Sequence, residues 1–296
     1  MKIIECVPNI SEGCDRKKID SIAAALSAVK GVKLLNVCVD QDHNRTVLTF
    51  IGEPEHVLIG ATAACEKALD LIDMRKHRGV HPRIGAVDVV PFVPLRGATM
   101  RDAVDLVHRF GRALGERRKI PVYFYGEAAL NPQRRELPDV RRGEYEALKA
   151  RFDDPLWMPD AGPARFDPRS GAAACGAREP LIAYNVNLAT DNLQVAKDIA
   201  CSIRQSSGGL QYVKAIGVPL ASRNIVQVSM NLTNYKVTPP RKVFDVIKEK
   251  AAASGISILE SELVGLIPEQ ALEGISADYL QLKNFCAECI IETHLQ

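Results

Sequence analysis

Two of the chain's six histidines and four basic residues crowd one short stretch, Arg75–Asp88, which reads RKHRGVHPRIGAVD. Pro82 directly follows His81 and disfavours helical backbone there, while Gly79 lets the chain turn. The stretch therefore predicts a shaped loop between a helical pattern and an apolar strand. A histidine in such a loop is suited to proton transfer near neutral pH. His81 is the candidate base, and its structural alternative is a hydrogen bond to the backbone.

A metal site is the weaker interpretation of this stretch. His77 and His81 have the spacing of a helical zinc site, but Gly79 and Pro82 interrupt the helix, and no neighbouring cysteine or carboxylate completes a ligand set. The one Cys-x-x-Cys, Cys286–Cys289, falls in a helix-like tail without a second pair, which favours one face of a terminal helix. The sequence predicts no metal.

Composition places the chain among ordinary globular proteins. It has 296 residues, 47% of them hydrophobic and 25% charged, with a formal net charge of +2. This charge gives no reason to expect nucleic-acid binding, and no apolar run approaches the roughly 20 residues of a membrane helix. The N-terminus lacks the apolar core of a signal peptide. Most of the eight cysteines sit in apolar patterns, which indicates a reducing, cytoplasmic compartment.

Apolar periodicity predicts the same order of elements in both halves of the chain: strand, helix, strand, strand, helix, strand. The first series runs from Ile3 to Phe92 and the second from Leu181 to Leu263. We therefore predict an α+β protein of two ferredoxin-like (βαββαβ) subdomains, 1–178 and 179–296, packed with a ligand cleft between them. Residues 156–176 show neither periodicity and are predicted to be an irregular ligand loop.

Long motifs in this chain resemble the glutamate formiminotransferase family, in its stand-alone form. The family moves a formimino group from N-formimino-L-glutamate to tetrahydrofolate, in histidine breakdown. The resemblance thus implies a cytoplasmic transferase with two anionic small-molecule substrates, no metal, and a homodimeric assembly. The motifs are VPNISEG at 7–13, DHNRTV at 42–47, HPRIGAVD at 81–88, PVYFYGEAA at 121–129, RRGEYEAL at 141–148, GAREPLIAYNVNL at 176–188, VQVSMNL at 226–232 and ELVGLIP at 262–268.

The resemblance also implies roles for particular residues. His81 takes the position of the catalytic histidine, which would accept a proton from the attacking amine and return it to the departing nitrogen. Asp40, at the end of the second strand, is the carboxylate predicted to orient it. The predicted folate-binding residues are Gly162, Pro163, Ala164, Arg165, Phe166, Asp167, Pro168, Arg169, Ser170 and Gly171.

Substrate carboxylates call for arginine, which binds them through two parallel hydrogen bonds. The predicted substrate-binding residues are Arg45, Arg83 and Arg178, together with Asn9 in the turn after the first strand. Two alternatives stay open from the sequence. One is a formiminotransferase that uses the glycine derivative, and the other is a non-catalytic module that binds folate or an amino acid and needs no proton-transfer residue.

Overall fold

The computed structural model describes residues 1–295, and the chain divides into two compact units, Met1–Arg178 and Glu179–Gln296. In the described part, none of the helices is long and apolar enough to cross a membrane. Each unit has its own sheet and its own apolar core.

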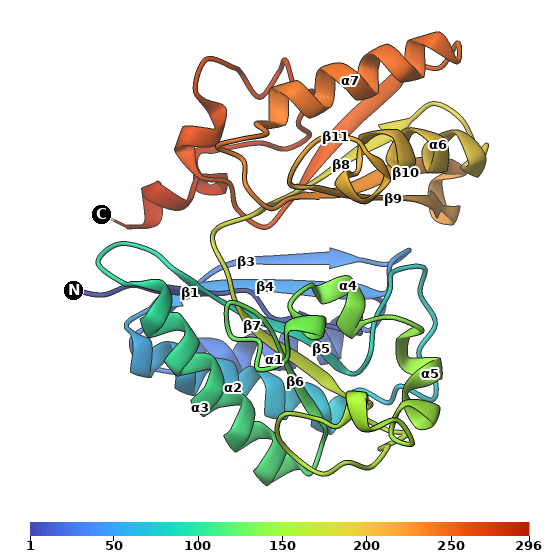
Figure 1. Cartoon of the computed structure of the whole chain (residues 1–296). Helices are drawn as coiled ribbons and strands as arrows, with labels where there is room; N and C mark the ends of the chain where they lie inside the picture. The colour runs from blue at the N-terminus through green and yellow to red at the C-terminus, as the bar shows by residue number, and fades with distance from the viewer. Residues whose placement is uncertain (296) are drawn as a thin grey trace. The chain divides into compact units, whose positions relative to one another are not determined.

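The first unit follows the predicted order and continues beyond it (Figure 1). Its strands are β1 (Ile4–Cys6), β2 (Asn9–Ile10), β3 (Val32–Asp40), β4 (Arg45–Gly52), β5 (Val87–Pro94), β6 (Val122–Gly126) and β7 (Ala173–Ala177). Its α-helices are α1 (Arg16–Ser27), α2 (Pro54–Leu71), α3 (Met100–Arg118), α4 (Leu137–Val140) and α5 (Glu144–Arg151), with short 3₁₀ turns at Pro132–Arg134 and Pro155–Trp157.

The seven strands form one sheet. Strands β1 and β2 act as a single strand interrupted near Pro8, since both pair with β4 on one side and β5 on the other. In space the strands follow one another as β3, β4, β1/β2 and β5, which is the antiparallel order of a βαββαβ unit. Beyond it, β7 pairs in parallel with both β5 and β6. The prediction of irregular structure was wrong for Ala173–Gly176, where Ala, Cys and Gly form a strand that is held by two neighbours.

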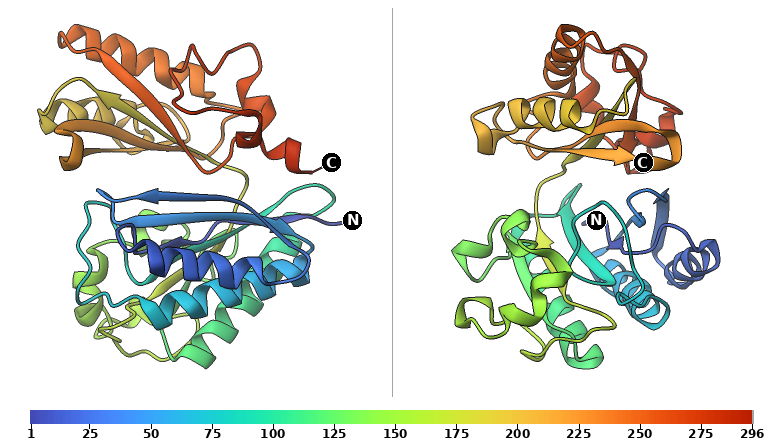
Figure 2. Two further views of the ribbon diagram at one scale, coloured as in Figure 1. Left: turned by 180° about the vertical axis from the view of Figure 1, so that it is seen from behind. Right: turned by 90° about the vertical axis from the view of Figure 1, so that its right-hand side faces the viewer.

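Helices α1, α2 and α3 cover one face of this sheet (Figure 1). Their ends follow ordinary rules: Asp15 caps α1, Pro54 begins α2, and Thr99 and Asp102 form a capping box on α3. The short helices α4 and α5 lie on the other face, next to the β5–β7–β6 edge (Figure 2). A second, smaller cluster of apolar residues packs there.

The second unit is a four-stranded antiparallel sheet with two helices on one face. Its elements are β8 (Ile182–Leu188), α6 (Leu193–Ile203), β9 (Val213–Leu220), β10 (Ile225–Leu232), α7 (Pro240–Ala253) and β11 (Ile258–Val264), with 3₁₀ turns at Gln205–Ser207, Ala221–Arg223 and Glu269–Leu272. The spatial order β11-β8-β10-β9 is that of a βαββαβ unit. The predicted order of elements is confirmed in this half.

The C-terminal tail is not the predicted helix. Its 3₁₀ turns, Ala287–Cys289 and Ile291–His294, flank a backbone bridge to Ile267. The N–H of Ile267 donates to the carbonyl of Cys289, and the N–H of Ile291 donates to the carbonyl of Ile267. These bonds take up backbone groups that a continuous helix would need. The thiols of Cys286 and Cys289 are free, with their sulfurs 3.7 Å apart.

Candidate functional site

The stretch Arg75–Asp88 is the shaped loop that the sequence predicts. It leaves the end of α2, lies along the β3–β4 turn and leads into β5. The side-chain amide of Asn44 donates to the carbonyl of Arg78, and the N–H of Val80 donates to the carbonyl of Asp42. A Cβ at Gly79 would stand 2.4 Å from the carbonyl oxygen of His43, so no larger residue fits there without a shift. The close approach fixes the loop against the turn.

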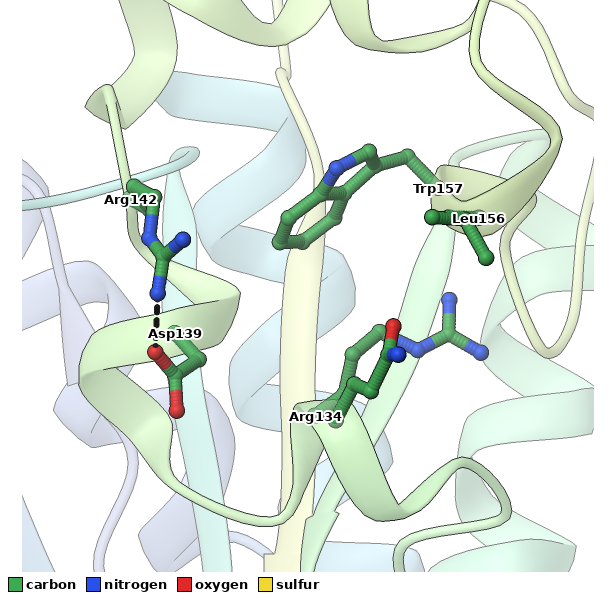
Figure 3. Close-up of a pocket in the computed structure, with 6 residues that line it drawn as sticks. Arg134, Asp139, Arg142, Leu156 and Trp157 are labelled. Carbon is green, nitrogen blue, oxygen red and sulfur yellow. Dashed lines mark hydrogen bonds and ion pairs between the residues drawn. The ribbon is translucent and has the colours of Figure 1, made fainter.

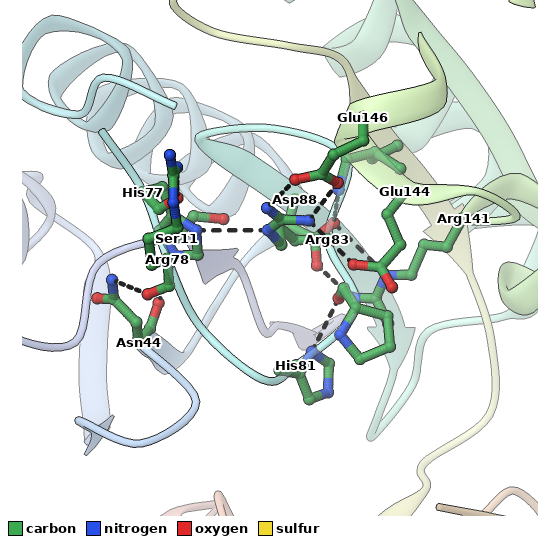
Figure 4. Close-up of polar contacts among 12 residues, drawn as sticks. Ser11, Asn44, His77, Arg78, His81, Arg83, Asp88, Arg141, Glu144 and Glu146 are labelled. Atoms are coloured by element: carbon green, nitrogen blue, oxygen red, sulfur yellow. Dashed lines mark hydrogen bonds and ion pairs between the residues drawn. The ribbon is translucent and has the colours of Figure 1, made fainter. Parts of the chain in front are cut away.

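Both ring nitrogens of His81 have hydrogen-bond partners, and Figure 4 shows the position of the ring in the loop. Nε2 lies 2.7 Å from Nη1 of Arg45, and Nδ1 lies 2.8 Å from the carbonyl oxygen of Pro82. A guanidinium can only donate and a carbonyl can only accept. Nδ1 therefore carries the proton, and Nε2 carries the lone pair. The loop presents a neutral imidazole in one defined tautomer.

The environment of His81 keeps this ring neutral. Burial lowers its pKa well below the ordinary value, and the cations Arg45 and Arg141, together with His43, lower it further. The hydrogen bond to Pro82 acts in the opposite direction. A lowered pKa leaves the ring unprotonated at neutral pH, which is the state required of a base.

Asp40 contacts His43, which is not among the predicted site residues. The backbone N–H of His43 donates to Asp40 Oδ1 over 2.8 Å, and the Nδ1 atom of His43 lies 3.2 Å from Asp40 Oδ2. The buried ring of His43 in turn packs against that of His81, with 5.5 Å between their centroids. Within residues 1–295 the polar side-chain contacts of Asp40 are with His43 rather than with His81, and the two histidine rings touch without a hydrogen bond between them. The sequence signal for a role of His43 was its position in the motif DHNRTV.

Arg45 stands opposite Asp40 in the β3–β4 register, so both side chains leave the same face of the sheet. Burial, followed by the charge of Arg141, lowers the pKa of Arg45 to about 10, so it remains charged at neutral pH. Its Nε atom is buried and has no hydrogen-bond partner within residues 1–295. Arg45 is thus an incompletely satisfied cation beside the candidate base.

Arg83, predicted to bind substrate, is used within the chain (Figure 4). It donates to both carboxylate oxygens of Glu146, at 2.7 and 2.6 Å, and to Glu144 at 2.9 Å. Its Nε donates to Nδ1 of His77, whose Nε2 donates to the carbonyl of Asn44. Only 8% of Arg83 is exposed. The side chain fastens α5 to the loop, a role that the sequence could not distinguish from carboxylate binding.

A further charge pair joins the buried Asp88 of β5 to the partly buried Arg141 (Figure 4). Asp88 is 1% exposed and also accepts from the backbone N–H of Ile84. Both residues lie inside quoted motifs but were not predicted as site residues. Arg141 is one of the cations that lower the pKa of His81. The pair therefore belongs to the electrostatic surroundings of the candidate base.

The other predicted substrate contacts lie on either side of β5, Asn9 in β2 and Arg178 just after β7. The Asn9 side chain, in β2, donates to the carbonyl of Val7 over 2.9 Å and is opposite Val47 of β4. Arg178 follows the end of β7 and hydrogen-bonds Tyr125, a buried tyrosine whose pKa is raised to about 12 by burial. The contact of Asn9 thus stabilises the turn after the first strand, and that of Arg178 lies within the first unit.

The segment Gly162–Gly171 lies against both ends of the loop. The N–H of Ala86 donates to the carbonyl of Ser170, and the N–H of Met74 donates to the carbonyl of Arg169, each over 2.8 Å. Phe166 packs against Tyr145, with 5.5 Å between ring centroids, in the smaller apolar cluster. The structure therefore brings the predicted folate segment beside the loop that carries His81.

A separate cleft of about 450 Å³ opens at the outer edge of the first unit (Figure 3). Its charged lining residues are already paired, Arg142 with Asp139 and Arg134 with Asp160. The predicted site residues are not among those that line it, which are Gln133, Arg134, Asp139, Arg142, Leu156 and Trp157.

Comparison with known proteins gives one consistent assignment. The formiminotransferase domain, N-terminal subdomain, matches residues 3–178, and the formiminotransferase domain matches residues 183–293. Glutamate formimidoyltransferase of Thermoplasma acidophilum is 44% identical over 100% of this chain and 98% of that protein, and its namesake from Streptococcus pyogenes serotype M1 is 40% identical over 99% of each. Formimidoyltransferase-cyclodeaminase of Gallus gallus is 44% identical over 95% of this chain and 53% of that protein. The chain belongs to the formiminotransferase family.

Proposed function

We propose that this chain transfers the formimino group of N-formimino-L-glutamate to tetrahydrofolate, giving 5-formiminotetrahydrofolate and L-glutamate. The observation that carries the proposal is the end-to-end similarity to two proteins named glutamate formimidoyltransferase. The neutral, oriented imidazole of His81 adds a chemical reason. A folate- or amino-acid-binding module would have no use for such a group.

His81 is the general acid and base in this proposal. The ring nitrogen of tetrahydrofolate adds to the formimino carbon and must lose its proton. The glutamate nitrogen must gain a proton as its bond to that carbon breaks. One imidazole can perform both transfers if its lone pair on Nε2 takes the first proton and returns it. The Nδ1–H bond to the Pro82 carbonyl fixes the tautomer that this requires.

The irregular residues 156–172, before strand β7, are the proposed ligand loop, with Gly162–Gly171 as the folate segment. Support comes from its backbone bonds to both ends of the histidine loop. Arg45 and Arg178 are the proposed contacts for substrate carboxylates. We assign the reaction to the cytoplasm because none of the eight cysteines, all within residues 1–295, is in a disulfide, and we propose a homodimer, which light scattering would test.

The test is turnover by the purified protein with tetrahydrofolate and either formiminoglutamate or formiminoglycine. The proposal expects turnover with formiminoglutamate and its loss in His81→Ala. Turnover restricted to formiminoglycine would assign the glycine-directed activity instead. Folate binding without turnover of either donor would contradict an enzymatic role and support a binding module.

A further inference from the structure

The hydrogen bonds of His81 present a difficulty for its proposed role. A general base needs a free lone pair directed at the proton it removes. The only lone pair on this ring, at Nε2, accepts from Arg45 at 2.7 Å, while Nδ1 is held by the Pro82 carbonyl. With both nitrogens occupied, the imidazole has the correct protonation state but cannot accept a proton.

The hydrogen bonds and ion pairs of Arg45 are incomplete in this position. Its Nε has no partner in the described part of the chain, and burial depresses its pKa. The two carboxylates that favour its charged form, Asp88 and Asp40, are engaged with Arg141 and His43 respectively. A neutral imidazole is a weaker acceptor for guanidinium than a carboxylate, which can take two parallel N–H bonds. Arg45 therefore has an unused capacity for a carboxylate ligand.

We infer that Arg45 masks the Nε2 lone pair of His81 until a carboxylate of the amino-acid substrate draws the guanidinium away. This inference rests on the proposed role of His81 and adds a second function to Arg45: it is a positioning residue that couples donor binding to exposure of the base. The matching substrate class is a dicarboxylic amino-acid derivative. Its arrival replaces an arginine–imidazole bond with an arginine–carboxylate bond.

Unmasking also changes the strength of the base. Three groups face His81 from three elements: Arg45 of β4, Arg141 at the end of α4 and His43 of the β3–β4 turn, and all three lower its pKa. Pairing Arg45 with a carboxylate cancels one of these charges, so the pKa of His81 rises toward neutrality. A base is most effective when its pKa lies near the operating pH. Donor binding would thus expose the lone pair on Nε2 and, at the same time, make His81 a stronger base.

The direct test is a titration of the His81 ring by ¹⁵N NMR, in the whole protein without tetrahydrofolate so that no turnover occurs. The expected result is a rise of about one unit or more in the His81 pKa on saturation with formiminoglutamate or with glutarate, a dicarboxylate without a formimino group. In Arg45→Gln the pKa is already high without ligand, and neither ligand changes it. Arg109→Gln, which removes an exposed arginine paired with Glu55, is the matched control and behaves as wild type.

Unchanged His81 titration with both ligands would overturn the inference, whatever the turnover assay gives. A shift with glutarate in a protein that turns over neither donor would uphold the mask and reject the proposed reaction. Kinetics add a readout that a structural role would not move. The acid limb of kcat/KM reports the free enzyme, so it lies at higher pH in Arg45→Gln than in wild type. Arg45→Lys retains a cation, so the acid limb of kcat/KM should stay at low pH. This variant provides the test if Arg45→Gln folds poorly.

Discussion

Two histidines of the Arg75–Asp88 loop, His77 and His81, have the same kinds of contact. Each ring accepts from an arginine through one nitrogen and donates to a backbone carbonyl through the other. Burial lowers the pKa of both. The kinds of partner are therefore the same for the two rings, although the proton lies on Nε2 of His77 and on Nδ1 of His81.

The difference lies in the arginine behind each ring. Arg83, behind His77, is balanced by the carboxylates of Glu144 and Glu146, and its pKa is raised. Arg45, behind His81, has an unpartnered Nε and a lowered pKa. A satisfied network is rigid and structural, whereas an unsatisfied one can exchange a partner for a ligand. The structural ring and the candidate base therefore differ in whether the arginine behind each has all its hydrogen-bond partners, and not in the histidine itself.

The largest expected effect comes from replacing each histidine in turn. His81→Gln removes the titratable nitrogen, so turnover should fall by at least about 100-fold, the usual contribution of acid–base catalysis. His77→Gln should retain most of the turnover and lose stability instead. Initial rates with formiminoglutamate and a thermal melt of each variant measure the two effects. Equal losses of turnover, with both melting temperatures at the wild-type value, would remove the distinction between the two rings.

Much of the fold followed from short-range signals. Strands and helices of both βαββαβ series have strong apolar periodicity, and their caps are local. Strand β7 was not predicted because Ala173–Ala177 has no β-branched or aromatic residue. The strand is held by its pairing with β5 and β6 on either side. The tail was assigned to a helix because its bridge to Ile267 is a tertiary contact that no local pattern records.

The site was harder to predict because its pairings span long stretches of sequence. Motifs drew attention to His81, Arg45 and Arg83, but not to the pairing of Arg83 with a carboxylate 63 residues away. Asp40 was named for its strand register, and that register decides only the face on which it lies. Its partner, His43, depends on the turn geometry. Residue types suggested which chemistry to expect, and the three-dimensional contacts decide which arginine remains available for it.

A smaller effect is expected from removing Arg83. Arg83→Met keeps much of the buried side-chain volume but leaves His77 Nδ1 without its donor and releases α5, at a cost of about 1–3 kcal/mol in the free energy of unfolding. Arg109→Met breaks an exposed pair of the same type and should cost below about 1 kcal/mol. Urea denaturation of both variants measures the difference. Retained stability with a raised KM in Arg83→Met would instead return Arg83 to substrate binding.

The smallest effect is the dependence of stability on pH that the buried rings impose. The folded state lowers the pKa of His77, His43 and His81 below the ordinary value of about 6.5. Protonation therefore favours the unfolded chain: the stabilisation is complete above the unfolded pKa and is lost as pH falls through the folded-state values. Urea midpoints should decline from pH 7.5 to pH 5.0, a range in which most carboxylates stay ionised. His77→Gln removes one of these groups, so its decline should be shallower than that of wild type. An identical slope would mean that the His77 ring, despite its arginine and carbonyl partners, titrates alike in the folded and unfolded chain.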